Sequence, residues 1–460
     1  ELYVGLDRVP TRTEHDFGSG QRAGADQRVQ IAAAGYAYAY VLVYGRDVPD
    51  APGEFTLTAA LPEFKVHQLA PNFGGNVGDV TVLIAGEGLP GEGGRAYLTN
   101  AAGATIEAWP VLPVDGASLY ATFDLRGAAA GWYDVVVEKP DGAAAVKANA
   151  LDVRAGGGAR LETRLIAPSV LRSGGFFQLT IEYANTGDVD MPAPVLTLSG
   201  PPGLAYSLDA DLADPFASVE FVGYSASGPA GVLQPGDREQ VTLFSAASVW
   251  QGSYGFSLGT HVAEADNPEP IDWDALRAES RQPFVTDEDE WDALWDVLAR
   301  ALGDDWSEVV ESLAERVTAD GVEAGKLPLV QDLLADELSR AMSRGGGLLD
   351  DAPLYIESTA PIPGLAGGVI AMDVIFSKTI DRATFGPDDV TLTGPDGQPV
   401  AGVTVARRSD RLYRVSFPAQ TAAGTYELAI GAEIADLAGR TLDLNCGSGI
   451  AAEADASHVA

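Results

Sequence analysis

The chain has 460 residues, of which 66 are acidic and 29 basic, and its formal net charge at pH 7 is −37. A surface this acidic repels phosphate backbones and argues against a nucleic-acid partner, and no run approaches the roughly 20 apolar residues that a membrane-spanning helix requires. The single cysteine, Cys446, excludes an internal disulfide framework, so the domains must rely on their cores.

This length predicts roughly three to five domains of ordinary size. Hydrophobic residues make up 46% of the chain, and its 53 glycines and 28 prolines indicate many short strands joined by tight turns. The chain begins at Glu1 with neither an initiator methionine nor a signal-peptide pattern, and we expect it to be part of a longer protein or a processed product. The acidic excess has two interpretations: a solvated surface that keeps an extracellular protein soluble, or a source of calcium ligands.

Residues 1–62 have the pattern of strands separated by loops, including a strand-like run at 54–61. Tyr36, Tyr38 and Tyr40 alternate with alanine, and packing in a sheet is favoured over a carbohydrate-stacking platform. The order LYV, PT, DF, GYAYAYVLVYG and FTLTA resembles the C-terminal part of bacterial pre-peptidase C-terminal domains, which are extracellular β-sandwiches. The resemblance implies that the first strands are missing, so that the domain begins in other polypeptide or another chain fills its open edge.

Residues 63–155 predict a second sandwich. The runs VHQLAPN at 66–72, VTVLIAGEGL at 80–89 and GWYDVVVEKPDG at 131–142 resemble the immunoglobulin-like TIG domain of cell-surface proteins. Apolar residues alternate in these runs, as in a strand with one buried face. Trp132 is interpreted as a core residue.

A glycine-rich linker at 155–158 precedes a longer sandwich at 159–266. The sequences YANTG at 183–187 and LQPGD at 233–237 are similar to the pattern of CARDB-like adhesion modules, which are Ig-type sandwiches of large bacterial surface proteins.

Residues 271–345 are the only long stretch with helical periodicity, and we expect a small helical unit inserted between β-domains. Trp291, Trp295 and Trp306 fall on its apolar faces. The helices could pack on one another, on a flanking sandwich or on another subunit. Self-packing, with these tryptophans as core, is favoured over a helical interface for a partner.

Residues 352–445 return to strand patterns. VIFS at 374–377, ID at 380–381, GTY at 424–426 and IADLAG at 434–439 closely resemble a bacterial Ig-like repeat. The small and polar residues 446–460 are expected to form a linker or tail.

Calcium is the one ion for which the sequence offers candidate ligands, because Ca²⁺ takes six to eight oxygens, including carboxylates. No motif requires a cofactor. The candidates are aspartates and glutamates that cluster in loops, and we name them in three groups: Asp188 and Asp190 after Asn185; Asp209 and Asp211 with Asp214; Glu14, Asp16 and Asp26. The acidic run 287–290 is interpreted as a solvated helix start.

Catalytic motifs are weak throughout. The four histidines have no H-x-x-x-H or H-E-x-x-H partner, and neither a G-x-S-x-G elbow nor a P-loop occurs. The G-x-G-x-x-G spacing at 86–91 continues into Glu92, Gly93 and Gly94, which is typical of a turn. We therefore predict a protein that is not an enzyme.

Taken together, these patterns predict a mainly β protein of tandem Ig-like sandwiches with one small helical insert. The predicted function is a structural or adhesive scaffold on a bacterial cell surface, acting as stalk or spacer. Its partners would be other segments of the same parent protein or identical subunits, with a cell-surface or carbohydrate ligand as a further option. Two alternatives stay open: a subunit of a self-assembling filament or sheath, and an accessory region of a large secreted hydrolase.

Overall fold

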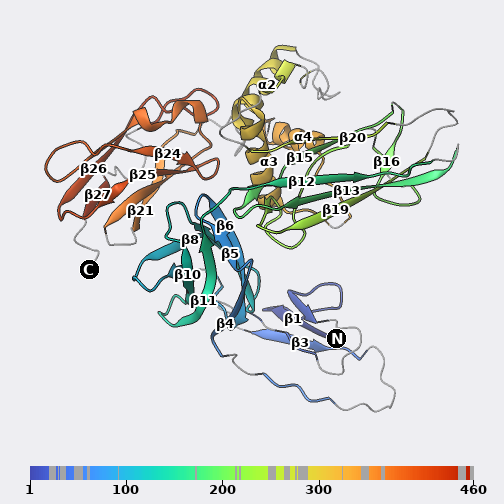
Figure 1. Cartoon of the computed structure of the whole chain (residues 1–460), viewed down its shortest axis with the longest axis horizontal. Coiled ribbons are helices and arrows are strands. Elements are labelled where there is room, and N and C mark those ends of the chain that lie inside the picture. Colours follow the sequence, from blue (N-terminus) through green and yellow to red (C-terminus); the bar gives the residue numbers. More distant parts are fainter. Residues whose placement is uncertain are drawn as a thin grey trace. The chain divides into compact units, whose positions relative to one another are not determined.

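The computed structural model describes residues 1–19, 27–29, 31, 38–45, 55–59, 63–91, 93–170, 174–201, 203–212, 215–216, 219–246, 255–263, 270–274, 277, 288–323, 325–342, 352–363, 368–443 and 452–455. The chain divides into two compact units, Glu1–Gly158 and Ala159–Ala460, and Figure 1 labels many of their elements. The described part is mainly β with three α-helices, which confirms the predicted fold class. Within it, no helix combines the length and the hydrophobicity needed to cross a bilayer.

The N-terminal sheet of the first unit has three antiparallel strands in the order β2-β1-β3. Their bounds are β1 (Leu2–Leu6), β2 (Phe17–Ser19) and β3 (Ala39–Val43). Tyr38 and Tyr40 are 68% and 40% exposed, whereas Tyr36 lies outside the described residues. The run predicted as a strand at 54–61 is wrong over its described part, 55–59, which is not a strand and exposes Phe55 and Leu57. Alternation shows only that a segment could pair, and pairing also requires a neighbouring strand.

A sandwich follows in the first unit, with eight strands in the order β4-β6-β9-β8-β7-β10-β11-β5. The bounds are β4 (Lys65–Ala70), β5 (Phe73–Gly75), β6 (Asp79–Glu87), β7 (Arg95–Thr99), β8 (Thr105–Pro113), β9 (Ser118–Asp124), β10 (Gly131–Glu138) and β11 (Ala144–Arg154). Strand β8 joins the two layers, because its first residues pair with β7 and the residues from Ala108 onward pair with β9.

Trp132 is not a core residue, as its 51% exposure shows. Tyr133, Val135 and Val137 are buried on the inner face of β10. Successive side chains of a strand point to opposite faces, so Trp132 must point outward.

The second unit begins with a sandwich of two sheets. One sheet has the order β12-β13-β19-β16 and the other β17-β15-β20. Their bounds are β12 (Leu161–Ile166), β13 (Phe176–Asn185), β15 (Val195–Ser199), β16 (Tyr206–Ser207), β17 (Val219–Val222), β19 (Arg238–Ala246) and β20 (Ser257–His261), with the short pair β14 (Met191–Pro192) and β18 (Val232–Leu233) beside them.

Three helices form a layer on the outer face of the β17-β15-β20 sheet: α2 (Glu288–Leu302), α3 (Trp306–Asp320) and α4 (Val330–Met342). Helices α3 and α4 pack on the strands, and α2 packs on these two helices. Leu196 and Phe221 belong to the core between the two sheets, whereas Val195 and Val222 belong to the helical core. Neighbouring residues of one strand thus bury both faces of this sheet. The helices pack on one another and also on the sandwich, so their core is shared and not self-contained.

The C-terminal sandwich pairs the sheet β21-β22-β25-β24 with the sheet β23-β26-β27. The bounds are β21 (Ile356–Pro363), β22 (Val369–Phe376), β23 (Val390–Thr393), β24 (Thr404–Arg407), β25 (Leu412–Gln420), β26 (Thr425–Ile430) and β27 (Ala452–Asp455), with 3₁₀ turns η1 (Arg382–Thr384) and η2 (Pro387–Asp389). Strand β27 lies in the segment predicted as a linker or tail, which is thus partly wrong: Ala452–Asp455 pair with β26.

Candidate functional site between helix α3 and the C-terminal sandwich

The three tryptophans singled out in the helical segment lie within the molecule. Trp291 and Trp295 are 1% and 3% exposed and pack in the core shared with the sandwich, with ring centroids 5.5 Å apart. Trp306 is partly buried and stacks on His261 of β20, with centroids 3.9 Å apart and planes at 9°. The Nε1–H of Trp295 donates to the carbonyl oxygen of Trp273 at 3.1 Å. These tryptophans join the helices to the sandwich.

The structure does not bring the two aspartate pairs together. Asp188 and Asp190 follow the end of β13, whereas Asp209 and Asp211 follow β16, which pairs with β19 opposite the start of β13. The pairs therefore lie at opposite ends of a ten-residue strand, roughly 30 Å apart. No group of three or more His, Cys, Asp or Glu in the described ranges could hold a metal ion. Calcium binding by either pair stays a prediction.

Two members of the third group, Glu14 and Asp16, are held by Arg8. The guanidinium contacts Asp16 at 2.6 Å and Glu14 at 3.1 Å. Its hydrogen bond lowers the pKa of Asp16, which also accepts from the Leu6 backbone N–H. Asp26, Asp214 and Asp287 lie outside the described residues, and Glu288, Asp289 and Glu290 open α2.

A cluster of charged groups lies instead on helix α3. One face of α3 is apolar, and Val309, Val310 and Leu313 are buried in the helical core. Glu308, Glu311 and Glu315 follow one another at helical spacing on another face.

The start of α3 is fixed by a reciprocal cap. The N-cap Asp305 accepts from the Glu308 N–H at 3.0 Å, and the Glu308 carboxylate accepts from the Asp304 N–H at 2.7 Å. Asp305 thereby satisfies one of the amides that the first helical turn leaves without partners, and Glu308 fixes the residue before the cap.

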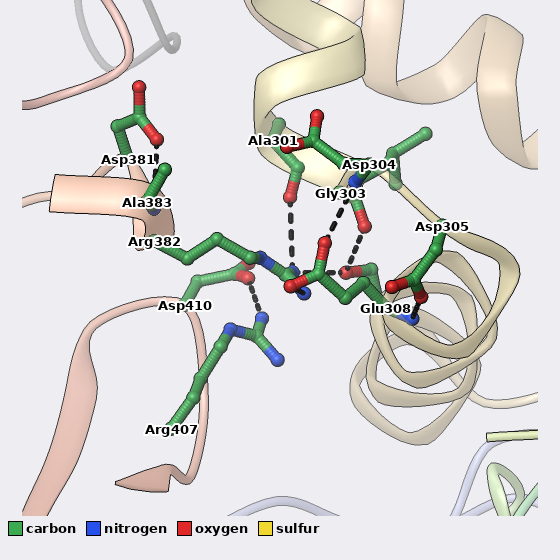
Figure 2. Close-up of polar contacts among 12 residues, drawn as sticks. Ala301, Gly303, Asp304, Asp305, Glu308, Asp381, Arg382, Ala383, Arg407 and Asp410 are labelled. Atoms are coloured by element: carbon green, nitrogen blue, oxygen red, sulfur yellow. Dashed lines mark hydrogen bonds and ion pairs between the residues drawn. The ribbon is translucent and has the colours of Figure 1, made fainter. Parts of the chain in front are cut away.

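Arg382 reaches this helix from the C-terminal sandwich (Figure 2). It lies in η1, which begins where Asp381 accepts from the Ala383 N–H at 3.1 Å. Its Nη2 donates to Ser312 Oγ of α3 at 2.7 Å and to the carbonyl oxygen of Ala301 in the last turn of α2 at 3.5 Å. A cation at a helix C-terminus is favoured by the helix dipole. The Nη1 atom lies 3.7 Å from Glu308.

Arg407 makes the second connection, from the end of β24. Its two terminal nitrogens donate to the two carboxylate oxygens of Glu315 at 2.7 and 2.8 Å, and it also contacts Asp410. A planar guanidinium matches a carboxylate in this forked geometry, which makes the pair directional as well as strong. Only 11% of the Arg407 side chain is exposed.

We call the six charged residues of this contact the α3 clasp. They are Glu308, Glu311, Glu315, Arg382, Arg407 and Asp410.

Carboxylates outnumber guanidinium groups in the α3 clasp, and burial shifts the pKa values of two of these carboxylates. Burial raises the pKa of Glu315 to about 7, although Arg407 opposes the shift, and burial also raises the pKa of Glu311. About a third of the Glu315 side chain (33%) remains exposed, so its carboxylate lies at the rim of the contact. Burial lowers the pKa of Arg407, but Glu315 and Asp410 outweigh burial and raise it overall.

A second ion pair holds α3 to α4. Arg316 of α3 contacts Glu337 of α4, which is 8% exposed and whose pKa burial raises. The arrangement thus connects three structural layers by charge. The α3 clasp and this second pair contain no nucleophile with an adjacent base. Their arrangement can hold one module against another or release it.

Sequence reasoning missed the α3 clasp. The spacing of Glu308, Glu311 and Glu315 away from the apolar stripe was a signal for a second contact face. Nothing in the sequence marked Arg382 and Arg407 as its partners, because both lie in short turns or strand ends about 70 to 90 residues away.

No family model matches the sequence, and no curated protein does either. Among solved structures, a gamma-CGTase from alkalophilic Bacillus clarkii is 16% identical, over 46% of this chain and 26% of that one, with a TM-score of 0.17. Salmonella alpha-2-macroglobulin reacted with methylamine is 13% identical, over 96% and 27%, with a TM-score of 0.16. The S-layer protein rSbsC is 10% identical, over 85% and 55%, with a TM-score of 0.16.

This chain spans 55% or less of each of those structures. At such TM-scores the likenesses assign neither a family nor a function. The module families suggested by sequence motifs therefore stay predictions. The chain is a modular β protein with a helical layer on one sandwich.

Proposed function

We propose that this chain is an extracellular structural scaffold of a bacterial surface protein, in which it acts as a stiff spacer and catalyses no reaction. The observation that carries the proposal is the way the modules of the second unit are joined. The helices share a core with the preceding sandwich, and forked ion pairs connect them to the following one. Joints of this kind limit bending, which a flexible linker would not.

Close contacts between α3 and the preceding sandwich strengthen the first joint. The Gly231 N–H donates to Thr318 Oγ1 at 3.0 Å, and a methyl group at Gly231 would overlap the carbonyl oxygen of Ala314. The Val222 N–H donates to the carbonyl oxygen of Pro328 at 3.0 Å, in the segment that leads into α4. Because these contacts are so close, we expect the helices and the sandwich to unfold as one body.

Force spectroscopy of single full-length chains tests the spacer role. Residues 161–342 should unfold in one event that releases roughly 650 Å of chain, because the helices and the sandwich share a core. The C-terminal sandwich should give its own event. Release of the helices alone, in a separate step at low force, would refute a stiff joint. Antibody labelling of intact against permeabilised source cells tests the extracellular location.

A filament or sheath subunit is the second candidate, and strand β3 favours it. Among the described strands, β3 pairs only with β1, and Tyr40, Val41 and Val43 are 40%, 43% and 36% exposed. An apolar strand at the edge of a sheet is a template for pairing with a second chain. The partner would be an identical subunit or another segment of the parent protein.

Sedimentation velocity separates this candidate from a monomeric spacer. If β3 pairs between chains, the wild type should form large species at high concentration and V41K should not, because an edge lysine opposes pairing. V77K is the matched control, since Val77 is 48% exposed outside β3. A wild type that stays monomeric at all concentrations would exclude the filament.

A further inference from the structure

The helical layer and the C-terminal sandwich have separate hydrophobic cores. The helical core draws on residues between Ala193 and Leu334, and the C-terminal core on residues between Leu354 and Leu442. Within the parts of the chain that the structure describes, no side chain belongs to both clusters. The contact between the two modules therefore depends on polar groups, as is common at interfaces between domains.

Several titratable and charged groups face Glu311 and Glu315 from the elements packed around them. They are Asp305, Glu308, Arg382, Arg407, Asp410 and Tyr413, while Glu337 of α4, which is paired with Arg316, adds a carboxylate whose pKa Asp410 also raises. Inside the α3 clasp itself, four carboxylates share two guanidinium groups. When the two modules dock at neutral pH, the excess carboxylates are therefore brought together at a contact from which water is partly excluded.

We propose that the α3 clasp is proton-dependent, so that the C-terminal sandwich docks on α3 more tightly at mildly acidic pH than at neutral or alkaline pH. Protonation removes one negative charge where carboxylates are in excess. Arg407 keeps Asp410 as an ionic partner, and a neutral Glu315 still accepts a hydrogen bond from it. This property goes beyond the proposed role as a passive spacer, because the pH of the solution would control how rigidly the C-terminal sandwich is held on α3.

The direction follows from proton linkage. In the docked state Glu315 has a pKa of about 7, against an ordinary value of 4.5 when it is exposed. A carboxyl group whose pKa rises on docking takes up a proton on docking, so its stabilising effect is complete below 4.5 and is lost as pH rises through 7. For these two values the docking constant would be roughly 70-fold larger at pH 5 than at pH 8. Because Glu315 is partly exposed, we expect a change on the order of tenfold.

Distances between two spin labels on the full chain measure docking directly. The labels are placed at exposed positions of α4 and β23, as Gln331→Cys and Thr391→Cys, with Cys446→Ser to remove the natural thiol. Between pH 5 and pH 8.5 the wild-type distance distribution should change from narrow to broad. Tryptophan fluorescence at each pH verifies that the helical core stays folded.

Three variants distinguish a proton switch from a plain ion pair. Glu315→Gln imitates the protonated side chain and should stay docked, with a narrow distribution, up to pH 8.5. Arg407→Ala should broaden the distribution at every pH. Glu323→Gln removes an exposed carboxylate outside the clasp and should behave as the wild type.

Two results would overturn the proposal. One is a wild-type distribution that is the same at pH 5 and pH 8.5, or broader at pH 5. The other is a Glu315→Gln variant that broadens at every pH as Arg407→Ala does, which would show that the charged pair itself holds the joint closed.

Discussion

Replacement of Asn185 by alanine should destabilise the sandwich of strands β12 to β20 far more than its position at the end of β13 suggests. The side chain is completely buried at 0% exposure. Its Nδ2 donates to the carbonyl oxygens of Val189 at 2.8 Å and Leu233 at 2.9 Å, and its Oδ1 accepts from the N–H groups of Gly187 at 3.0 Å and Arg160 at 3.3 Å. One amide thereby joins the ends of β12, β13 and β18.

The expected cost follows from these four bonds. Each contributes about 0.5–1.5 kcal/mol net, and a buried group left without a partner costs about 1–3 kcal/mol. Alanine removes the side chain of Asn185 and leaves two carbonyl oxygens at a buried site and two N–H groups at a partly buried one without this partner. We expect a loss of about 4 kcal/mol in the free energy of unfolding.

Urea unfolding followed by tryptophan fluorescence measures this loss, because four of the seven tryptophans lie at 273–306 in or against the core that the helices share with this sandwich. With a slope of about 2 kcal/mol per molar urea, the midpoint should fall by about 2 M. Thr186→Ala is the matched control and should cost less than about 0.5 kcal/mol, since its hydroxyl makes one exposed bond of 3.4 Å. A loss below about 1 kcal/mol for Asn185→Ala would refute the reasoning.

Two further substitutions test other joints. Gly231→Ala should lower the free energy of unfolding of the helical layer by about 2–3 kcal/mol, because its methyl group would overlap the carbonyl oxygen of Ala314. Gly259→Ala is the control: its methyl group would lie 3.8 Å from the nearest atoms, those of Thr197, so the same urea titration should show little change. Asp436→Ala should lower the free energy of unfolding of the C-terminal sandwich by about 3 kcal/mol, since this 1% exposed carboxylate accepts from two backbone N–H groups and an arginine. Calorimetry measures the loss. An equal loss for Asp396→Ala, whose carboxylate accepts one exposed hydrogen bond, would contradict this explanation.

Strand alternation predicted the parts of the fold in which one face of a sheet is buried. Val80, Val82 and Ile84 alternate in the sequence and are fully buried in β6. The same rule, applied strictly, would have placed Trp132 on the outer face opposite Tyr133. Trp132 was predicted to be a core residue because of its residue type. Its position in the alternation is what determines which face of the strand it occupies.

Sheets with two buried faces defeat the alternation rule. Val195 and Leu196 are adjacent and both 0% exposed, and so are Phe221 and Val222. Such pairs signal a strand covered on both sides, but a run of two is too short to distinguish from chance. This is why the helices could be predicted while their attachment to the β17-β15-β20 sheet could not.

Buried and half-buried polar side chains take the place that disulfides occupy in many small extracellular domains. In the first sandwich the side chain of Asn76 donates to the Ala128 carbonyl oxygen and accepts from the Gly156 N–H, which lie 52 and 80 residues away. In the second sandwich the Asn185 side chain donates to the Leu233 carbonyl oxygen, 48 residues away. In the third, the Asp436 carboxylate accepts from the Arg440 N–H and orders a loop. In each case one side chain fixes loops whose closure would otherwise cost conformational entropy. An amide or carboxylate can do this reversibly and without an oxidant, so a chain with one cysteine can still hold the ends of its sandwiches in place.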